Sequence, residues 1–315
     1  MTENVAVLFI SGQSNAHAHG QLLKESDYIV KPLKNVFSLD RTPNQSFDIT
    51  DVVWSGFTTQ GKNLGETQDN TYSFSYFLAK LWQNAIDCGA DLPDLYIVQI
   101  SVGRQGIING MWNRDKEKVM VPGPLDTVDI SLFPWAMQVN RLVMENLKRS
   151  GKKPTVIGWH WIGSEQDIHK DAYSRDDFQE RYNYFFDSLL TSIGEQCPLF
   201  LYKIGCKKFC EQHQVPTNAV DAVNKVLQSQ CERYENVTLV DIETYPCYYR
   251  TTCTNLYSES LDTFETLLIG GCYAERVCSV VILELLHLCL HIECDTLLAQ
   301  NTIAGRVAKS TENAG

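Results

Sequence analysis

The chain has 315 residues, 44% of them hydrophobic and 21% charged, which is an ordinary composition for a globular protein with a core of substantial size. Its length fits one large α/β domain or two small ones. The formal net charge of −11 argues against nucleic acid or an anionic membrane as the main partner, because both bind basic surfaces. Acidic glycans stay open as partners where a pocket is locally basic.

The chain begins with a short polar stretch that leads into an apolar strand. Residues 5–10 read VAVLFI, a continuous β-branched run of the kind that forms a central strand covered on both faces. No basic segment precedes this run, so we expect no signal peptide and a location in the cytoplasm or in a virion. Gly12 ends the run, and Ser14 stands where a helix could begin. A serine at such a turn is either a helix cap or a nucleophile at the edge of a parallel sheet.

Strand and helix patterns alternate along most of the remaining chain. Further apolar runs predict strands at 94–100, 154–159, 198–204 and 237–241, and amphipathic patterns predict helices at 73–89, 134–149, 174–193 and 217–232. This alternation predicts a mostly parallel sheet with helices on both faces. Two long polar segments, 25–70 and 103–127, are predicted to be loops, and loops of that length are usually functional.

Most of the cysteines lie in the last third of the chain. Ten of the eleven lie between Cys197 and Cys294, and their irregular spacing favours free thiols over a disulfide framework. The spacing of Cys206, Cys210 and His213 matches none of the usual zinc patterns. We therefore expect no metal there.

The end of the chain is predicted to be a separate segment. Residues 277–292 are apolar apart from a few positions, but the run is too short and too interrupted for a membrane span. The pattern is typical of a buried terminal helix or strand, and the residues after it are polar. We therefore expect one domain at 1–280, followed by an apolar segment and a polar tail at 281–315.

Three loops that follow predicted strands carry the residues of chemical interest. They read GQSN at 12–15, SVGRQG at 101–106 and WIGSEQD at 161–167. In a parallel sheet the carboxyl ends of neighbouring strands lie at the same edge, so these loops are expected to meet in one pocket.

Together the three motifs resemble those of the SGNH hydrolase superfamily, in its branch of sialate O-acetylesterases and acetylxylan-esterase-like enzymes. The resemblance covers about residues 5–280; the first motif is specific, the second is loose, and the third is altered. It implies a flavodoxin-like three-layer α/β/α sandwich with a mostly parallel sheet. It also implies hydrolysis of acetyl esters on O-acetylated carbohydrates, with no cofactor and no metal.

The resemblance assigns roles to four residues. Ser14 matches the nucleophile, and the backbone N–H groups of Ser14 and Gly103 would form the oxyanion hole together with a side-chain amide. Glu165 and Asp167 match an acidic pair that ties the loops together. From the residues alone, a solvated turn explains this pair equally well.

The third motif departs from the family pattern at the amide. With Trp161 and Glu165 as anchors, the glutamine of the family falls on Gly163 and its glycine falls on Ser164. The amide donor is then missing at this position. Its possible replacements are Gln13, Gln105 and Gln166.

The histidine that acts as general base in the family is not found at its expected place. The family carries Asp-x-x-His just before its last helix, which is predicted here at Ser260 to Arg276. On that alignment Asn255 replaces the aspartate and Ser258 replaces the histidine, and no histidine occurs between His213 and His287.

Other histidines are therefore candidates for the base. His160 and His169 flank the third motif and are the first candidates. The others lie near Ser14 or in the terminal segment: His17, His19, His287 and His291.

The sequence thus leads to a carbohydrate O-acetylesterase, of sialate type, with an acyl-enzyme on Ser14. The alternative is a catalytically impaired member that binds glycans, as a recognition module of a virion or a cell surface. A histidine nitrogen within hydrogen-bond reach of Ser14 Oγ would favour the enzyme.

Overall fold

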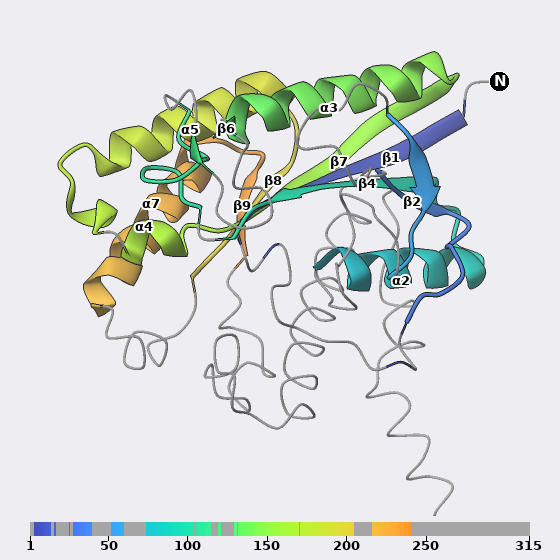
Figure 1. The fold of residues 1–315 in the computed structure, drawn as a ribbon, viewed down its shortest axis with the longest axis horizontal. Coiled ribbons are helices and arrows are strands. Elements are labelled where there is room, and N and C mark those ends of the chain that lie inside the picture. Colours follow the sequence, from blue (N-terminus) through green and yellow to red (C-terminus); the bar gives the residue numbers. More distant parts are fainter. Residues whose placement is uncertain are drawn as a thin grey trace, which may run out of the picture.

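A computed structural model of the chain describes residues 3–13, 16, 25, 28–39, 52–59, 74–103, 105–114, 119–120, 129–130, 132–169, 171–204 and 216–240. Seven strands in these ranges form one sheet in the order β3-β2-β4-β1-β7-β8-β9 (Figure 1). Their bounds are β1 Glu3–Gly12, β2 Val36–Leu39, β3 Trp54–Gly56, β4 Asp94–Ser101, β7 Lys152–Ile162, β8 Leu199–Tyr202 and β9 Val237–Val240. Neighbouring strands are parallel, apart from the antiparallel pair of β2 and β3.

The strand order places a switch point at β1. Taken alone, β4-β1-β7-β8-β9 has the chain order 2-1-3-4-5 of flavodoxin-like sheets. The chain passes from β1 to one side, reaches β4, and then crosses to β7 on the other side of β1. In open α/β sheets of this kind, ligands bind outside the carboxyl end of the strand where the direction reverses.

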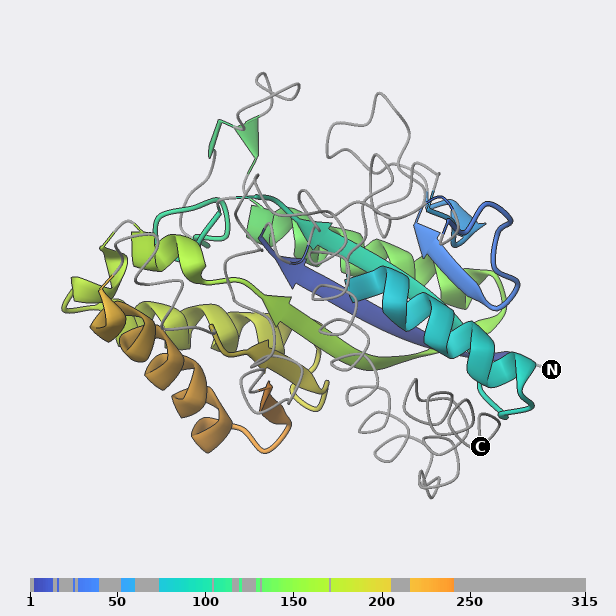
Figure 2. The same ribbon diagram turned by 90° about the horizontal axis from the view of Figure 1, so that it is seen from below.

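Helices cover both faces of the sheet (Figures 1 and 2). On one face lie α3 (Leu132–Arg149), α5 (Phe178–Ile193) and α7 (Thr217–Arg233), and on the other lies α2 (Phe74–Asp87). Successive side chains of β1 point to opposite faces of the sheet. Val7 and Phe9 pack on the α3 side, and Leu8 and Ile10 pack on the α2 side. The prediction of a three-layer α/β/α sandwich with a mostly parallel sheet is confirmed.

The five predicted strands and the four helices predicted between residues 73 and 232 are all present, with small differences at their ends. The helix predicted at Ser260 to Arg276 lies outside the described residues. The predicted helix at 174–193 begins only at Phe178, because a short 3-10 turn, η3 (Ala172–Ser174), precedes it. A short helix after β7, α4 (Glu165–His169), was not predicted.

The prediction of an elaborated loop over the sheet edge at 25–70, rather than a domain, missed two short strands. This segment contributes β2 and β3, which extend the sheet beyond β4. The Trp54 ring packs edge-on against Tyr96, with 4.8 Å between ring centroids, and its Nε1 donates to Asn146 Oδ1 at 3.1 Å. Strands of three and four residues are too short to show an alternation in the sequence.

The segment predicted as a second loop, 103–127, is described only in part. Residues 105–114 form turns, and β5 (Val119–Met120) pairs with β6 (Asp129–Ile130) in a separate two-stranded sheet.

Several sequence predictions fall outside the described residues. These are the domain boundary at 280, the terminal segment 281–315, and the group Cys206, Cys210 and His213. The described cysteines, Cys88, Cys197 and Cys231, are free thiols. Among the described helices, none has the length and apolar character needed to cross a membrane.

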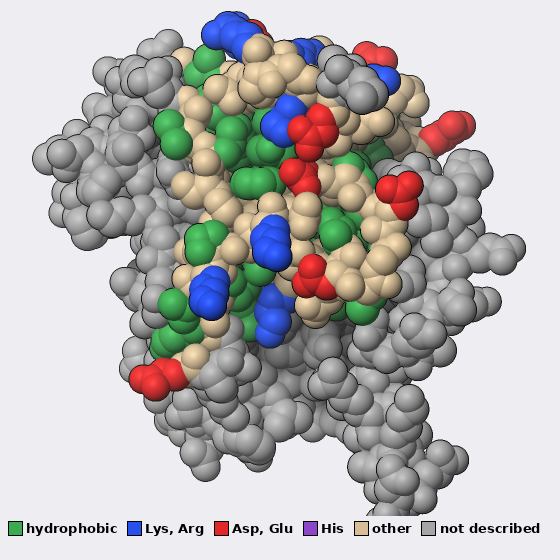
Figure 3. Space-filling view, turned by 90° about the vertical axis from the view of Figure 1, so that its right-hand side faces the viewer, with side chains coloured by type: hydrophobic (Ala, Val, Ile, Leu, Met, Phe, Trp, Pro, Cys, Tyr) green, Lys and Arg blue, Asp and Glu red, His purple; other side chains and the backbone are tan. Residues whose placement is uncertain are grey.

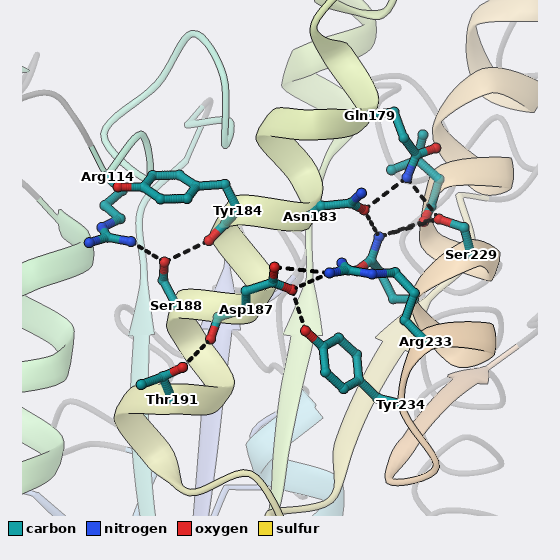
Figure 4. A network of polar contacts seen from close by, with 12 residues as sticks. Arg114, Gln179, Asn183, Tyr184, Asp187, Ser188, Thr191, Ser229, Arg233 and Tyr234 are labelled. Atoms are coloured by element: carbon teal, nitrogen blue, oxygen red, sulfur yellow. Dashed lines mark hydrogen bonds and ion pairs between the residues drawn. The ribbon is translucent and has the colours of Figure 1, made fainter.

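A polar network links the helices on the α3 side (Figure 4). Asp187 of α5 forms an ion pair with Arg233 of α7 at 2.7 Å and accepts a hydrogen bond from Tyr234. At the other end of the network the Arg114 guanidinium stacks on the Tyr184 ring at 4.2 Å. The segment that follows β4 is thereby held against α5.

The opposite end of the molecule, where β1 begins, carries mixed charges (Figure 3). Lys152 Nζ forms an ion pair with Glu3 at 2.8 Å and lies 5.6 Å from the centre of the Tyr96 ring. The hydrogen bond to Glu3 raises the pKa of Lys152 above its usual value. Interspersed charges of this kind are typical of an ordinary solvated surface.

Candidate active site

The three loops singled out in the sequence begin at neighbouring points of the sheet. Gly12, the last residue of β1, pairs with Ser101 of β4 on one side and with Ile162 of β7 on the other. The Gln13 N–H donates to the Ile162 carbonyl at 3.1 Å, and the Val102 N–H donates to the Gly12 carbonyl at 3.3 Å. The strand ends therefore converge as predicted, at the switch point of the sheet.

The junction requires a glycine at position 12, because of the backbone conformation there and because of the lack of space for a side chain. Its φ of +139° is a conformation that residues with a side chain rarely adopt, and a Cβ there would lie 1.9 Å from the Ile162 carbonyl oxygen. Gly163 is different, because a Cβ there would meet only ordinary contacts, 3.4 Å from Gly12 Cα and 3.5 Å from the Gln13 nitrogen.

The loop after β4 is attached to β1 and folded on itself by side chains. Trp112 Nε1 donates to the Gly12 carbonyl at 2.9 Å, and the Trp112 ring packs edge-on against Trp161, with 5.0 Å between centroids. Inside the loop, Gln105 Oε1 accepts the N–H of Met111 at 3.0 Å. Each of these tryptophans is fully buried, so the loop is fixed by packing as well as by hydrogen bonds.

Asp167 of α4 holds the same loop from the side of β7. Its Oδ2 accepts the Ile107 N–H at 2.9 Å and the Tyr182 hydroxyl at 2.9 Å. Its Oδ1 accepts the N–H groups of Ile108 at 3.2 Å and Asn109 at 3.5 Å. One buried carboxylate thus binds three successive main-chain donors, which fixes the path of the loop that begins near Gly103.

The environment of Asp167 leaves little freedom for change. Burial raises the pKa of this carboxyl group above its usual value, and the hydrogen bonds from the loop and from Tyr182 oppose that rise. A Cβ at Gly106 would lie 2.2 Å from Asp167 Oδ1, so only glycine allows the loop to approach the carboxylate this closely.

The turn between β7 and α4 is connected to the residue before Ser14. Ser164 is buried with a φ of +95°, and its Oγ accepts a hydrogen bond from Trp161 Nε1 at 3.3 Å. In the first turn of α4 the Gln166 N–H donates to Gln13 Oε1 at 3.3 Å. The acidic motif is therefore part of a folded junction rather than a solvated turn.

His160, one of the candidate bases, lies inside the sheet. Its ring is fully buried, stacks on Phe200 with 4.7 Å between centroids, and shares a hydrogen bond between Nδ1 and the Tyr202 hydroxyl at 2.8 Å. Burial lowers its pKa to about 3. An imidazole that binds a proton so weakly is a poor general base, so we do not assign it that role.

The remaining residues predicted for this site are described only in part. Gly103 is described and is exposed, two residues after the end of β4. His169 ends α4, and its side chain is outside the described part. The other site residues outside the described ranges are Ser14, His17, His19, Asn255, Ser258, His287 and His291. Within the described ranges, no group of three His, Cys, Asp or Glu side chains is arranged to hold a metal.

Two buried residues of this junction were not predicted. Gln99 in β4 donates from Nε2 to the Ala16 carbonyl at 2.7 Å, which ties β4 to the segment after Ser14. The sequence could have indicated Gln99, because it is a polar residue inside the apolar run LYIVQIS. Tyr182 gave no such signal, since an aromatic residue on the buried side of an amphipathic helix is ordinary.

No known protein-family model matches this sequence, and no curated protein matches it either. Solved structures do resemble it. NanS aligns with a TM-score of 0.59 and 14% identity over 90% of this chain and 98% of its own. A protein from Arabidopsis thaliana aligns with a TM-score of 0.53 and 14% identity over 89% of this chain and 98% of its own.

A carbohydrate acetylesterase from Xanthomonas citri aligns with a TM-score of 0.50 and 11% identity over 89% of this chain and 56% of its own. At such identities the likeness shows the fold alone. The chain is therefore an α/β protein with a flavodoxin-like strand order. This is the fold that the resemblance to the SGNH hydrolases implied.

Proposed function

We propose that this protein is a carbohydrate O-acetylesterase in which Ser14 is the nucleophile. The observation that carries the proposal is the position of Gly12, which pairs with the last residues of both neighbouring strands. Ser14 follows it by two residues in the sequence, in the first of the three loops that start at this junction. This is the switch point, where α/β folds place their active sites.

The proposed reaction proceeds through an acetyl-enzyme. Ser14 Oγ attacks the acetyl carbonyl carbon while a base takes its proton, and the proton then passes to the sugar oxygen as the ester bond breaks. Water attacks the acetyl-enzyme in the second step, with the same base accepting its proton; the base returns this proton to Ser14 Oγ as the bond to the acetyl group breaks and acetate leaves. The N–H groups of Ser14 and Gly103 would stabilise the negative oxygen in both steps, and each such donor is typically worth about 100- to 1000-fold in rate.

Asp167 acts in this proposal as a positioning residue. It touches no reacting atom, but it holds the N–H groups of Ile107, Ile108 and Asn109. The loop that carries Gly103 therefore has a fixed end close to the sheet. An oxyanion donor needs such a fixed position, since its effect depends on being placed before the charge develops.

The substrate class rests on two supports. The sequence motifs resemble those of sialate and xylan acetylesterases, and the fold is similar to that of a carbohydrate acetylesterase and of NanS. A sialate ester is the finer proposal within this class. The base is proposed to be one of the histidines other than His160.

The test is hydrolysis of an aryl acetate and of O-acetylated sialic acid by the wild type and by Ser14→Ala. We expect the wild type to release acetate and the variant to lose this activity with nearly unchanged melting. Activity that survives the substitution would refute the role of Ser14.

The second candidate is a glycan-binding module without turnover. It is favoured by Asn255 and Ser258, which stand where the family carries its aspartate and histidine. Binding of acetylated glycans by a wild type that releases no acetate would support this candidate and overturn the esterase.

A further inference from the structure

Ser164 has a backbone conformation that costs free energy. It lies in the turn between β7 and α4, is fully buried, and has a φ of +95°. A residue with a side chain rarely adopts this conformation, whereas a glycine adopts it without strain. The family that the motifs resemble carries glycine at this position, so the serine is a feature of this chain. The Ser164 side chain is therefore expected to make contacts that offset the strain.

The Ser164 hydroxyl lies between two other buried polar groups. Its Oγ accepts a hydrogen bond from Trp161 Nε1 at 3.3 Å. Burial raises the pKa of Tyr182 well above its usual value, and a hydrogen bond from Ser164 opposes that rise. A hydrogen bond that lowers the pKa of a phenol is one donated to its oxygen, because it stabilises the negative charge. Ser164 thus donates to Tyr182, whose own hydroxyl donates to Asp167 Oδ2 at 2.9 Å.

These contacts form a chain that can be ordered in only one direction. The Trp161 indole nitrogen can only donate, and the Asp167 carboxylate can only accept. Each of the two hydroxyls between them accepts one hydrogen bond and donates one. All four side chains are 0% exposed, so the chain is out of contact with bulk water. Hydrogen bonds in a buried chain strengthen one another, so the Ser164 hydroxyl strengthens the bond that Tyr182 donates to Asp167.

The chain ends on the carboxylate that holds the loop after β4. The Oδ2 atom that accepts the Tyr182 hydroxyl also accepts the Ile107 N–H at 2.9 Å, and Oδ1 accepts the Ile108 N–H at 3.2 Å. A carboxylate that is held by Tyr182 presents its oxygens to these N–H groups in a fixed orientation. Ser164 acts on the loop only through Tyr182 and Asp167.

We propose that Ser164 is a positioning residue, whose hydroxyl orients Asp167 through Tyr182 and thereby fixes the loop that follows Gly103. The strained backbone at position 164 is then the cost of placing this hydroxyl in the chain. The inference rests on the proposed esterase only for its effect on turnover. Its effect on the loop is a property of the folded protein and is measured without a substrate.

The test compares Ser164→Ala with Ser164→Gly. Both variants lose the hydroxyl, but only glycine adopts a φ of +95° without strain. We expect the Tm of Ser164→Gly to lie about 2–4 °C above that of Ser164→Ala. The two variants should nevertheless share the same change in the loop and in turnover. With a merely structural role of Ser164, these changes would follow Tm.

Hydrogen exchange of the loop amides, measured by NMR, reports the positioning directly. In both variants the N–H groups of Ile107 and Ile108 should exchange about 2- to 10-fold faster than in the wild type, because the loop loses the support of about one hydrogen bond. In an active esterase, kcat should fall about 3- to 10-fold in both variants with little change in KM, since positioning acts on the transition state.

Thr59→Val is the matched control for the loss of a buried hydroxyl. Thr59 is 1% exposed, and its Oγ1 accepts the Ile29 N–H at 2.9 Å. It follows β3, which begins beside the last residue of β2 and runs back towards the opposite edge of the sheet. We expect this control to lower Tm, while the exchange of the Ile107 N–H and kcat stay within about twofold of the wild type.

The outcomes separate this inference from the proposed function. Wild-type exchange of the Ile107 and Ile108 amides in Ser164→Gly would overturn the inference, also where Ser164→Ala does not fold. So would a change confined to Ser164→Ala, because it would follow the strain rather than the hydroxyl. A folded wild type without esterase activity would overturn the proposed function, while faster exchange of these amides in Ser164→Gly would still support the role of Ser164.

Discussion

Replacing Asp167 with asparagine should damage both stability and catalysis, because its carboxylate accepts four hydrogen bonds. Its two oxygens accept three main-chain N–H groups and the Tyr182 hydroxyl. An asparagine turns one of these oxygens into an NH₂ group, so at least one buried main-chain N–H loses its acceptor in either orientation of the amide. A buried donor without an acceptor costs about 1–3 kcal/mol.

This cost should appear in thermal unfolding and in kinetics. For a domain somewhat smaller than this chain, 1 kcal/mol corresponds to about 2–4 °C, so we expect Tm to fall by several degrees. The loop that carries Gly103 would lose its fixed end, and kcat should fall by about 10- to 100-fold, less than the loss of a whole oxyanion donor. Differential scanning calorimetry and acetate release at 25 °C measure the two effects.

Tyr182→Phe is the control for this experiment. It removes one hydrogen bond from Oδ2 but leaves the three main-chain donors with their acceptors. Its effects on kcat should therefore be smaller than those of Asp167→Asn. An Asp167→Asn variant with the Tm and kcat of the wild type would show that the carboxylate does not hold the loop.

Three further outcomes are expected. Gly12→Ala should abolish folding, since its Cβ would lie 1.9 Å from the Ile162 carbonyl oxygen. Gly89→Ala is the control, because position 89 also has a positive φ, +92°, but no atom lies within 4 Å of its Cβ. The control should yield folded protein in a solubility and circular-dichroism assay. Because burial lowers the pKa of His160 from 6.5 to about 3, its neutral form stabilises the folded state above pH 6.5, and this contribution is lost as the pH falls towards 3. Between pH 6.5 and 3 the free energy of unfolding, measured with urea, should fall by up to about 5 kcal/mol more in the wild type than in His160→Gln. Equal decreases in the two proteins would contradict the burial of a neutral His160. Arg233→Ala should cost at most about 1 kcal/mol, as its ion pair with Asp187 is partly exposed, and a larger loss in chemical denaturation would mean that this network is stronger than its exposure indicates.

The sequence predicted the central layers because their signal is long and continuous. The run at 5–10 is buried on both faces, and the five predicted strands with their four helices left few possible topologies. The meeting of the three loops followed from that topology alone. The short strands β2 and β3 were missed because strands of three or four residues have no readable period.

The detailed junction was harder to predict, because it depends on contacts between residues far apart in the chain. Asp167 was recognised as a residue that ties loops together, but its three main-chain partners lie about 60 positions earlier and are apolar or amide residues without a motif. Tyr182 lies on the buried face of a helix, where the sequence pattern is that of ordinary core. His160 was a candidate base because it flanks a motif, yet the alternation of β7 turns it into the packed interior.

The esterase proposal stands or falls with a covalent acetyl group on one residue. The wild type is mixed with an excess of aryl acetate, quenched in acid within the first turnover, digested and analysed by mass spectrometry. We predict one acetyl group on the peptide that contains Ser14, absent from Ser14→Ala and lost from the wild type when the substrate is exhausted. Acetate release without any acetylation of Ser14, or acetylation confined to another residue, would contradict the mechanism.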